Sequence, residues 1–297
     1  PPFNISYKYD KYKDKLKSDK YIAWSRDWMR SCVNILKPQG SFYIAIGAEY
    51  AAHVRIIGEE LGMTLRNWII WHYTFGQQTK TKFARAHTHI FYFVMDPDNF
   101  VFNDHTIRVP SDRQLTYNDK RANPKGKMPD DVWNEYSRVC GTFSERLQWH
   151  PCQMPESLLT RIISVSSNEG DVVFDPFMGS ATTAAAAVQL DRKYSGTDMS
   201  EDYVKNGRKR IADLKQQISK KDNSPDPLNA RETLELKRLL IDMAIPVRDL
   251  TQSKKLMYFF HQQYQQRMNN SKQYNPEDLI TPMKEFINLD QKSKRKP

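Results

Sequence analysis

The stretch Asp171–Asp198 constrains the fold of this chain more than any other part of the sequence. The short apolar run 171–174 is followed by Gly179, by the alanine-rich run 184–190 and by a second short run that ends at Asp198. This order predicts a strand, a tight turn, a helix and a second strand. The turn then lies at the carboxyl end of a strand, which is where open α/β sheets bind ligands.

Features of this stretch fit a nucleotide-like cofactor. Gly179 lacks the Cβ atom that keeps a ligand away from the backbone, and a helix beginning near Ala181 presents unpaired N–H groups to an anion. Asp198 is placed to accept hydrogen bonds from two ribose hydroxyls, as an acid does in dinucleotide-binding folds. From spacing alone, a merely structural strand–helix–strand unit remains an equal alternative.

Three short motifs resemble those of S-adenosylmethionine-dependent amino-methyltransferases of DNA. Residues 175–183, Asp-Pro-Phe-Met-Gly-Ser-Ala-Thr-Thr, resemble the family motif Asp-Pro-Phe-x-Gly-x-Gly-Thr-Thr. Residues 150–155, His-Pro-Cys-Gln-Met-Pro, resemble His-Pro-Thr-Gln-Lys-Pro, and residues 1–4 resemble the end of an Asp-Pro-Pro-Phe/Tyr motif. The order, with Pro-Pro-Phe first and the cofactor loop last, is similar to the circularly permuted β class, and the resemblance covers roughly residues 1–212.

The resemblance implies a fold of the α/β class. A Rossmann-like methyltransferase fold is expected, with a mostly parallel sheet ending in an antiparallel hairpin, a recognition insertion and a helical C-terminal extension. The implied division is a catalytic half (1–95), a target recognition insertion (96–147), a cofactor-binding half (148–219) and the helical extension (220–297).

The resemblance also implies roles for individual residues. S-adenosylmethionine is the expected cofactor, and no metal is needed. The residue before Pro1 and the Pro1 carbonyl would accept the two N–H groups of the target amino group, and Phe3 would stack on a base rotated out of the duplex. Adenine N6 is favoured as the target, with cytosine N4 as the alternative. The expected catalytic residues are Pro1, Pro2 and Phe3, and the expected cofactor-binding residues are His150, Gln153, Asp175, Phe177, Gly179, Ser180, Thr182 and Asp198.

Two departures from the family pattern motivate a different class of protein. Ala181 stands where the third glycine is usual, and Met154 stands where lysine is usual. A catalytically inactive, DNA-binding protein with a methyltransferase fold is therefore one alternative. An RNA methyltransferase is another, although those with Asp-Pro-Pro-Tyr generally have the cofactor motif first. Because the chain opens on Pro1, we also expect a truncated N-terminus, with the strand that precedes this motif absent.

A competing interpretation comes from Cys152. Pro-Cys-Gln is also the nucleophile motif of cytosine-C5 methyltransferases, but their glycine loop precedes the cysteine, whereas here Gly179 follows it. Since no Glu-Asn-Val tripeptide is present either, Cys152 is better interpreted as replacing the threonine of the family motif. The three cysteines have no metal-ligand spacing, and the pair His87 and His89 has no further ligand after it, so a metal site is not expected.

The formal charge of +10 suggests a polyanionic partner, here double-stranded DNA, although a charge that only maintains solubility is the alternative. The basic segment 75–85 and the weakly periodic insertion 96–147 are the expected contact regions. A tyrosine- and lysine-rich stretch, residues 7–12, could stack on bases or be a solvated loop. The expected DNA-binding residues are Lys80, Lys82, Arg85, Arg108, Arg113, Lys120, Arg121 and Lys125.

Hydrophobic periodicity predicts the remaining elements. Neither a membrane span nor a signal peptide is indicated, so we expect a cytoplasmic protein of a bacterial nucleoid or a phage. The tail is interpreted as an accessory domain that binds DNA, a second copy of the chain or an accessory subunit, with a structural helical cap as the alternative. The predicted helices are 21–36, 51–61, 156–165, 200–217, 230–243, 253–268 and 276–287, and the predicted strands of the first half are 41–46, 65–73 and 89–95.

Overall fold

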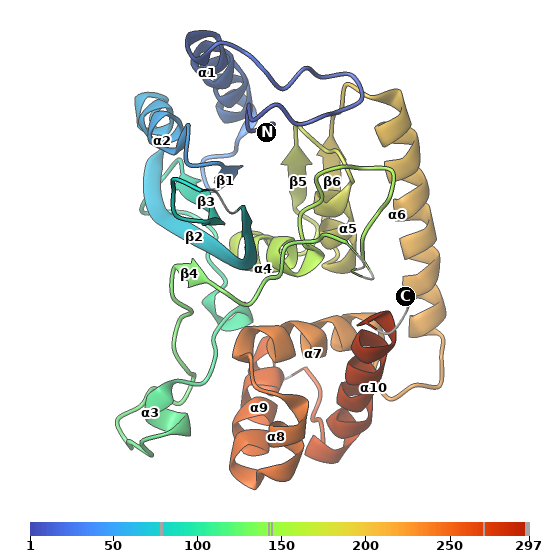
Figure 1. Ribbon diagram of the computed structural model, residues 1–297. Helices are drawn as coiled ribbons and strands as arrows, with labels where there is room; N and C mark the ends of the chain where they lie inside the picture. Colours follow the sequence, from blue (N-terminus) through green and yellow to red (C-terminus); the bar gives the residue numbers. More distant parts are fainter. Residues whose placement is uncertain (78–79, 142, 144, 270, 295–297) are drawn as a thin grey trace.

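The computed structural model describes residues 1–77, 80–141, 143, 145–269 and 271–294 (Figure 1). The first half of the chain contains α1 (Ser18–Ile35), β1 (Ser41–Ile46), α2 (Ala51–Glu60), β2 (Thr64–Gln77) and β3 (Arg85–Val94). The middle contains η1 (Asp104–Thr106), α3 (Asp112–Leu115), β4 (Val132–Trp133), α4 (Glu156–Ser166), β5 (Val172–Asp175), α5 (Thr182–Gln189), β6 (Lys193–Gly196) and α6 (Glu201–Asp222). The last part contains α7 (Ala230–Met243), α8 (Val247–Gln252), α9 (Lys254–Arg267) and α10 (Pro276–Lys294).

The strands form two sheets. One has the order β1-β3-β2-β4, and the other consists of β5 and β6. Strand β3 pairs antiparallel with both β1 and β2, whereas β4 pairs parallel with β2 and β5 pairs parallel with β6. The α/β class is confirmed.

The expectation of a mostly parallel sheet ending in a hairpin is wrong for the described strands. Strand β3 lies between β1 and β2 and pairs antiparallel with both of them. The short strand β4 forms the edge of the sheet beyond β2. The expectation came from the family resemblance. The sequence of this chain could not correct it, because apolar runs reveal that a strand is buried but carry no information about its direction or neighbours.

Helices cover both faces of the four-stranded sheet. On one face, Ile44 and Phe93 pack with Met29 of α1 and Ile57 of α2. On the other face, residues of β2 and β3 pack with Leu158 and other residues of α4. Because both faces are covered, β3 is buried almost continuously from Ile90 to Val94.

The predicted helices start close to the observed ones, but α6 and α10 continue beyond their predicted ends, to Asp222 and Lys294. The C-terminal extension holds one more helix than predicted, α8, which is only six residues long. The predicted strands 65–73 and 89–95 are too short, because β2 extends to Gln77 and β3 begins at Arg85, both within the basic segment 75–85. Residues 78–79 of that segment lie outside the described residues. The helical extension was expected from residue 220, but α6 continues to Asp222.

The helices α7–α10 have a core of their own. Leu236, Phe260, Leu279 and Met283 are fully buried there. These helices lie below the cofactor half in Figure 1, and α7 contacts α4, α5 and α6. Among the described residues, no helix is both long enough and apolar enough to cross a membrane.

Ala181, which stands where the family motif has glycine, lies against Gly207 of α6. Ala181 adopts a left-handed conformation, with φ +59° and ψ 28°, immediately before α5. This conformation costs an L-residue with a Cβ about 1–2 kcal/mol, which gives a reason for glycine there. A Cβ added to Gly207 would lie 3.0 Å from the Ala181 Cβ. The methyl group of Ala181 therefore occupies the space that the missing side chain of Gly207 leaves.

We predict that positions 181 and 207 are energetically coupled. Gly207→Ala alone gives no stabilisation or lowers stability, because the new methyl group crowds Ala181. In an Ala181→Gly background the same change stabilises by about 1 kcal/mol, the helix-propensity difference between glycine and alanine. Urea unfolding of the four proteins measures the coupling. Gly207→Ala combined with Ala212→Gly, an exposed position of α6, is the additive control. Additivity in the Ala181 cycle would contradict the prediction.

Candidate active site

The turn between β5 and α5 is held by Asp175, the last residue of β5. Its Oδ1 atom accepts a hydrogen bond from the Phe177 N–H at 2.9 Å, and its Oδ2 atom accepts one from the Thr183 hydroxyl at 2.6 Å. Met178 donates its N–H to the Thr197 carbonyl at 2.9 Å, beyond the end of β6. The turn is thereby fixed to both strands at their carboxyl ends.

Asp198 joins the neighbouring strand to the same turn. Its Oδ2 atom accepts the Gly179 N–H at 2.8 Å, and its Oδ1 atom accepts the Ser200 N–H at 2.9 Å. A carboxylate offers about four acceptor positions, so these two bonds leave about two for a ligand. That number matches the two hydroxyls of a ribose.

Gly179 makes room for a histidine. Its φ is +49°, and a Cβ built on it would lie 2.8 Å from Nε2 of His150. A ligand was expected in this space, but the His150 ring occupies it. His150 is buried, and burial lowers its pKa to about 4, so the ring is neutral near pH 7. The centroid of its ring lies 4.7 Å from that of the Tyr203 ring, in an edge-to-face arrangement.

Ser180 and Thr182 are buried on the α6 side of the turn. Their hydroxyls are 2.8 Å apart, and Arg210 of α6 donates to the Ser180 carbonyl at 2.5 Å and to the Thr182 hydroxyl at 3.2 Å. The same guanidinium pairs with Glu156 at 2.5 Å. Sequence reasoning missed Arg210, because nothing in the helical pattern of α6 distinguishes it from the exposed cations beside it.

Gln153 supports the backbone of the preceding segment. Its amide nitrogen donates to the Glu145 carbonyl at 2.7 Å, and its amide oxygen accepts the Leu147 N–H at 2.9 Å. Both ends of the side chain are thus in use. A direct contact of Gln153 with a cofactor stays a prediction.

Phe177 connects the turn after β5 to the first helix of the chain. Its ring lies 5.7 Å from Trp24 and 5.2 Å from Trp28, both on α1, and the contact with Trp28 is edge-to-face. Aromatic pairs in this range add about 0.5–1.5 kcal/mol beyond the area they bury. The cofactor turn is therefore packed against the first helix of the chain.

The Pro-Pro-Phe segment reaches the same place. It is anchored to α1, the same helix on which Phe177 packs. Tyr21 donates its hydroxyl to the Pro2 carbonyl at 2.6 Å. Among the described residues, the Pro1 carbonyl accepts no hydrogen bond. Phe3 packs against the core formed by α1, β1 and α2.

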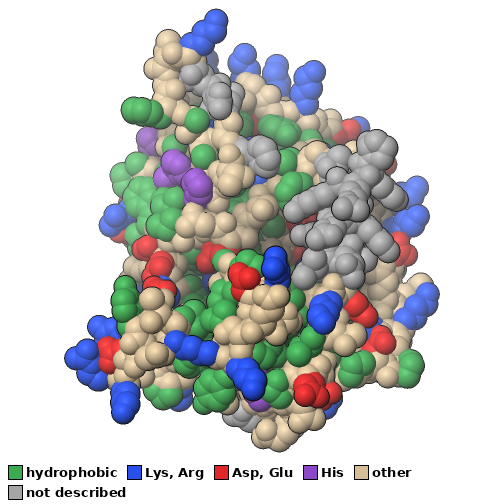
Figure 2. All heavy atoms as spheres, turned by 60° about the horizontal axis from the view of Figure 1, so that its bottom comes forward, with side chains coloured by type: hydrophobic (Ala, Val, Ile, Leu, Met, Phe, Trp, Pro, Cys, Tyr) green, Lys and Arg blue, Asp and Glu red, His purple; other side chains and the backbone are tan. Residues whose placement is uncertain are grey.

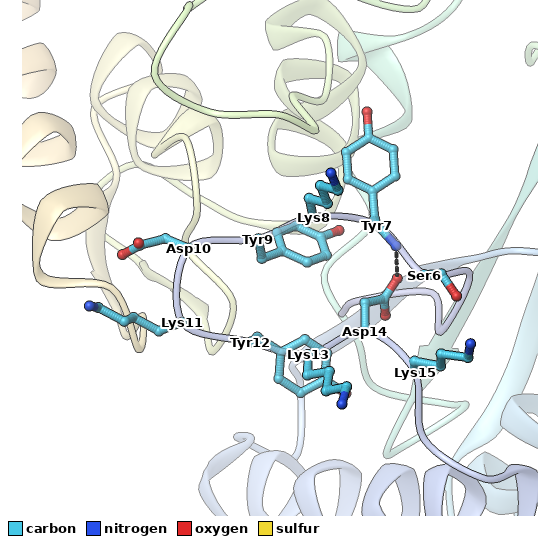
Figure 3. Close-up of a pocket in the computed structure, with 10 residues that line it drawn as sticks. All are labelled: Ser6, Tyr7, Lys8, Tyr9, Asp10, Lys11, Tyr12, Lys13, Asp14 and Lys15. Atoms are coloured by element: carbon cyan, nitrogen blue, oxygen red, sulfur yellow. Dashed lines mark hydrogen bonds between the residues drawn. The ribbon is translucent and has the colours of Figure 1, made fainter.

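Residues 6–15 cross from this segment to the start of α6 and surround an open pocket of about 530 Å³ (Figure 3). The buried Asp14 carboxylate accepts the N–H groups of Asn4, Ile5 and Tyr7 at 2.7–3.0 Å. At the far end, Ser200 donates its hydroxyl to Asp10 at 2.7 Å.

The tyrosines of this segment face inward and the lysines face solvent. Tyr12 stacks on Trp24 at 5.9 Å, and the Tyr7 hydroxyl donates to the Pro151 carbonyl at 3.2 Å. Lys8, Lys11 and Lys13 are exposed. The segment is thus an ordered loop whose tyrosines are partly buried and whose lysines are exposed.

The predicted DNA-binding residues fall into two groups. Arg108 is largely engaged within the protein, by Asp104 at 2.6 Å and by the Gly126 carbonyl at 3.0 Å, and Arg85 pairs with Glu49 at 2.5 Å. Arg121 pairs with Asp119 but remains mostly exposed. The exposed predicted contacts are Lys80, Lys82, Arg113, Lys120, Arg121 and Lys125.

An exposed aromatic residue was missed. The Phe83 side chain is fully exposed, between Lys82 and Arg85 in the β2–β3 connection. The signal was an apolar residue inside a basic segment.

His87 and His89 share one face of β3. Their ring centroids are 4.8 Å apart, and the Trp68 indole N–H donates to His89 at 2.9 Å. Over the described part of the chain, no group of three or more potential ligands is arranged for a metal ion.

Comparison with known proteins assigns the family. The family described as DNA methylase matches residues 1–209. Type II methyltransferase M.HpaI of Haemophilus parainfluenzae is 36% identical over 212 residues, which are 71% of this chain and 66% of that protein. DNA adenine methyltransferase YhdJ of Escherichia coli (strain K12) is 36% identical over 219 residues, which are 71% of this chain and 74% of that protein.

This chain belongs to the DNA methylase family. The resemblance drawn from the three motifs is confirmed, and with it a methyltransferase that uses S-adenosylmethionine and acts on DNA, at the level of the family. The solved structure of PvuII DNA methyltransferase (cytosine-N4-specific) aligns with a TM-score of 0.51 at 19% identity, covering 73% of this chain and 82% of that one. At that identity it supports the methyltransferase fold alone. The aligned part spans about two thirds of the length of the HpaI relative.

The site of this DNA methylase fits the family's cofactor. Asp198 keeps acceptor positions for ribose hydroxyls, and no side chain of the described residues caps the first turn of α5. Ala181 preserves the backbone conformation that glycine would adopt. Met154 packs against the core beside Leu158 and Ile162, a place for an apolar side chain rather than a charged one. The residues that depart from the family motif therefore leave the turn intact.

We predict that protonation of His150 destabilises the methyltransferase in acid. Its pKa falls from 6.5 to about 4 on folding, so the unfolded chain binds the extra proton. The free energy of unfolding should therefore be fully retained above about pH 6.5 and decline as the pH falls toward 4. Urea titrations at pH 7, 5.5 and 4.5 measure this. His150→Gln should flatten the decline, and His105→Gln, in η1, is the control. An equally steep decline without His150 would contradict the prediction.

Proposed function

We propose that this chain transfers the methyl group of S-adenosylmethionine to an exocyclic amino group of a base rotated out of double-stranded DNA, with adenine N6 favoured over cytosine N4. The observation that carries the proposal is the meeting of two distant motifs. Tyr21 of α1 donates its hydroxyl to the Pro2 carbonyl at 2.6 Å, and Phe177 of the glycine turn packs on the same helix. One site then has both a cofactor turn and a target-base segment.

The cofactor half provides binding and alignment. Asp198 would hold the ribose, and the turn fixed by Asp175 would hold the rest of the cofactor near the carboxyl end of β5. The cofactor supplies an electrophilic methyl group on its sulfonium. Neutral His150 packs over Gly179 and keeps the turn closed without adding a positive charge beside that sulfonium.

The N-terminal segment acts on the target base. An exocyclic amino nitrogen is a weak nucleophile, because its lone pair is delocalised into the ring. A carbonyl that accepts an amino N–H favours the more tetrahedral nitrogen that reacts. The Pro1 carbonyl serves this role, and the Tyr21 bond to the Pro2 carbonyl fixes the segment that carries it. Much of the rate comes from aligning the nitrogen with the methyl group.

The preference for adenine rests on a relative rather than on geometry. The relative from Escherichia coli is named as an adenine methyltransferase, and its identity to this chain is 36%. The inactive, DNA-binding alternative was motivated by Ala181 and Met154. Both residues are accommodated without disturbing the turn, by Gly207 and by the core around Leu158.

We expect the full chain to produce N6-methyldeoxyadenosine in DNA incubated with S-adenosylmethionine. Mass spectrometry of the nucleosides from a digest of unmethylated genomic DNA tests this. N4-methyldeoxycytidine instead would move the activity to the cytosine alternative. Absence of both products, together with absence of cofactor binding by calorimetry, would support the inactive protein. Structured RNA in parallel reactions tests the RNA alternative.

We predict that Asp198→Asn weakens cofactor binding by about ten- to a hundredfold, since hydrogen bonds to a charged group contribute about 1.5–3 kcal/mol each. Affinity for duplex DNA should change less than twofold. Calorimetry measures the first quantity and fluorescence anisotropy the second. Asp202→Asn removes the same charge from an exposed position of the first turn of α6 and serves as the control. Equal losses of cofactor and DNA affinity would remove Asp198 from this role.

A further inference from the structure

Residues 109–127, called the recognition loop below, form a closed unit within the insertion. Val109 and Lys127 exchange two backbone hydrogen bonds, of 3.1 and 2.8 Å, and close the base of the loop. Inside it, α3 is capped by a reciprocal pair of bonds between Ser111 and Gln114. The loop therefore has a defined shape and two adjacent ends.

The C-terminal helices hold this loop by its backbone. Lys255 of α9 donates to the Leu115 carbonyl at 2.7 Å, and Gln263 of α9 donates to the Lys125 carbonyl at 3.2 Å. Residues just before the loop are held in the same way.

Two buried arginines hold those preceding residues. Arg267 donates to the Arg108 carbonyl at 3.1 Å, and Arg238 of α7 donates to the Thr106 carbonyl at 3.2 Å. Every one of these four acceptors is a main-chain carbonyl. The helices thus fix the path of the chain whatever side chains the loop presents.

Gly126 allows the close approach of the loop to α9. Its φ is +82°, and a Cβ on it would lie 2.4 Å from the Val109 carbonyl and 2.8 Å from the Gln263 amide nitrogen. These separations are too short for real atoms. The loop and α9 therefore fit each other at this point without space for a side chain.

A buried charge cluster continues the connection to the methyltransferase core. Asp242 of α7 accepts the Tyr136 hydroxyl at 2.7 Å and pairs with Arg267 at 2.8 Å and with Arg161 of α4 at 3.5 Å. Arg161 lies 5.0 Å from both the Trp133 and the Tyr136 ring centroids. The helical extension, the insertion and the helix after the His-Pro motif thus meet at Asp242.

The cationic side chains of the recognition loop and Tyr117 face outward. Arg113, Lys120, Arg121 and Lys125 are exposed, and Tyr117 is 73% exposed. Figure 2 shows Lys and Arg side chains gathered at the lower left, the side on which α3 lies in Figure 1. The loop has its main chain fixed from behind and its cations directed away from the protein, which is a suitable arrangement for contacting phosphates and base edges.

We infer that α7 and α9 position the recognition loop for duplex DNA, so that Lys255 and Gln263 are positioning residues for DNA binding although they need not touch DNA. The inference rests on the proposed function for its partner. It assigns the C-terminal extension a role other than a second DNA-binding domain or a structural cap.

The test compares two double variants of the full chain. Lys255→Met with Gln263→Met removes both donors to the loop while keeping side chains of similar size. Lys254→Met with Gln262→Met makes the same changes one residue earlier on the same helix, where both side chains are exposed. Hydrogen exchange of the loop amides, anisotropy with a duplex DNA and calorimetry with S-adenosylmethionine are measured on both.

We expect the Lys255/Gln263 variant to exchange the amides of 109–127 at least tenfold faster and to bind duplex at least fivefold more weakly, with cofactor affinity within twofold of the parent. In active protein, KM for DNA should rise while kcat stays within twofold. The control variant should match the parent in all five quantities.

Unchanged exchange, unchanged DNA affinity despite faster exchange, or an equal loss of cofactor affinity would each overturn the inference. Failure of the proposed function is distinguishable. A parent protein that binds duplex but methylates nothing refutes the enzyme and leaves the positioning role to be judged by exchange and DNA affinity. A parent that does not bind duplex refutes both.

Discussion

The packing of Phe177 on Trp24 and Trp28 is the contact on which the site depends. It joins a turn near the end of the methyltransferase unit to the first helix of the chain, about 150 residues earlier. Neither half contains a complete site. The turn has the acid that suits a ribose, and the opening segment has the carbonyl and the ring that suit a base. An aromatic contact that buries little polar surface can hold these parts together without consuming the hydrogen-bonding groups that a ligand needs.

A second junction, around Asp242, is built from charges instead. Burial alone would raise the pKa of the Asp242 carboxyl, but Arg161, Arg267 and Arg238 outweigh it and hold the pKa below its ordinary value. Removing one partner from such a cluster typically costs about 3–5 kcal/mol, because a buried charge is left uncompensated. Replacing the whole cluster by apolar residues is often neutral, so the charges are better understood as specifying how the parts fit than as adding stability.

Much of the site could be predicted from the sequence because its information is local. The strand, turn and helix around Gly179 are specified by consecutive residues, and Asp198 follows shortly after them in the chain. What the sequence could not reveal depends on distant partners. The use of Gln153 by the backbone of residues 145–147, the bond of Arg210 to the turn and the ordering of residues 5–15 by Asp14 all join positions whose proximity only the fold creates. Sheet order failed for the same reason, since hydrophobic runs do not encode which strands are neighbours.

The fit between Ala181 and Gly207 has a consequence for how this protein can diverge. The space between the turn and α6 holds one methyl group, so only one of positions 181 and 207 can carry an alanine without crowding. An ancestor with glycine at both places can accept alanine at either one, but whichever arrives first closes the other to substitution. A turn that carries alanine could then not be placed in a descendant that has alanine on α6, although a turn that carries glycine could be placed in either.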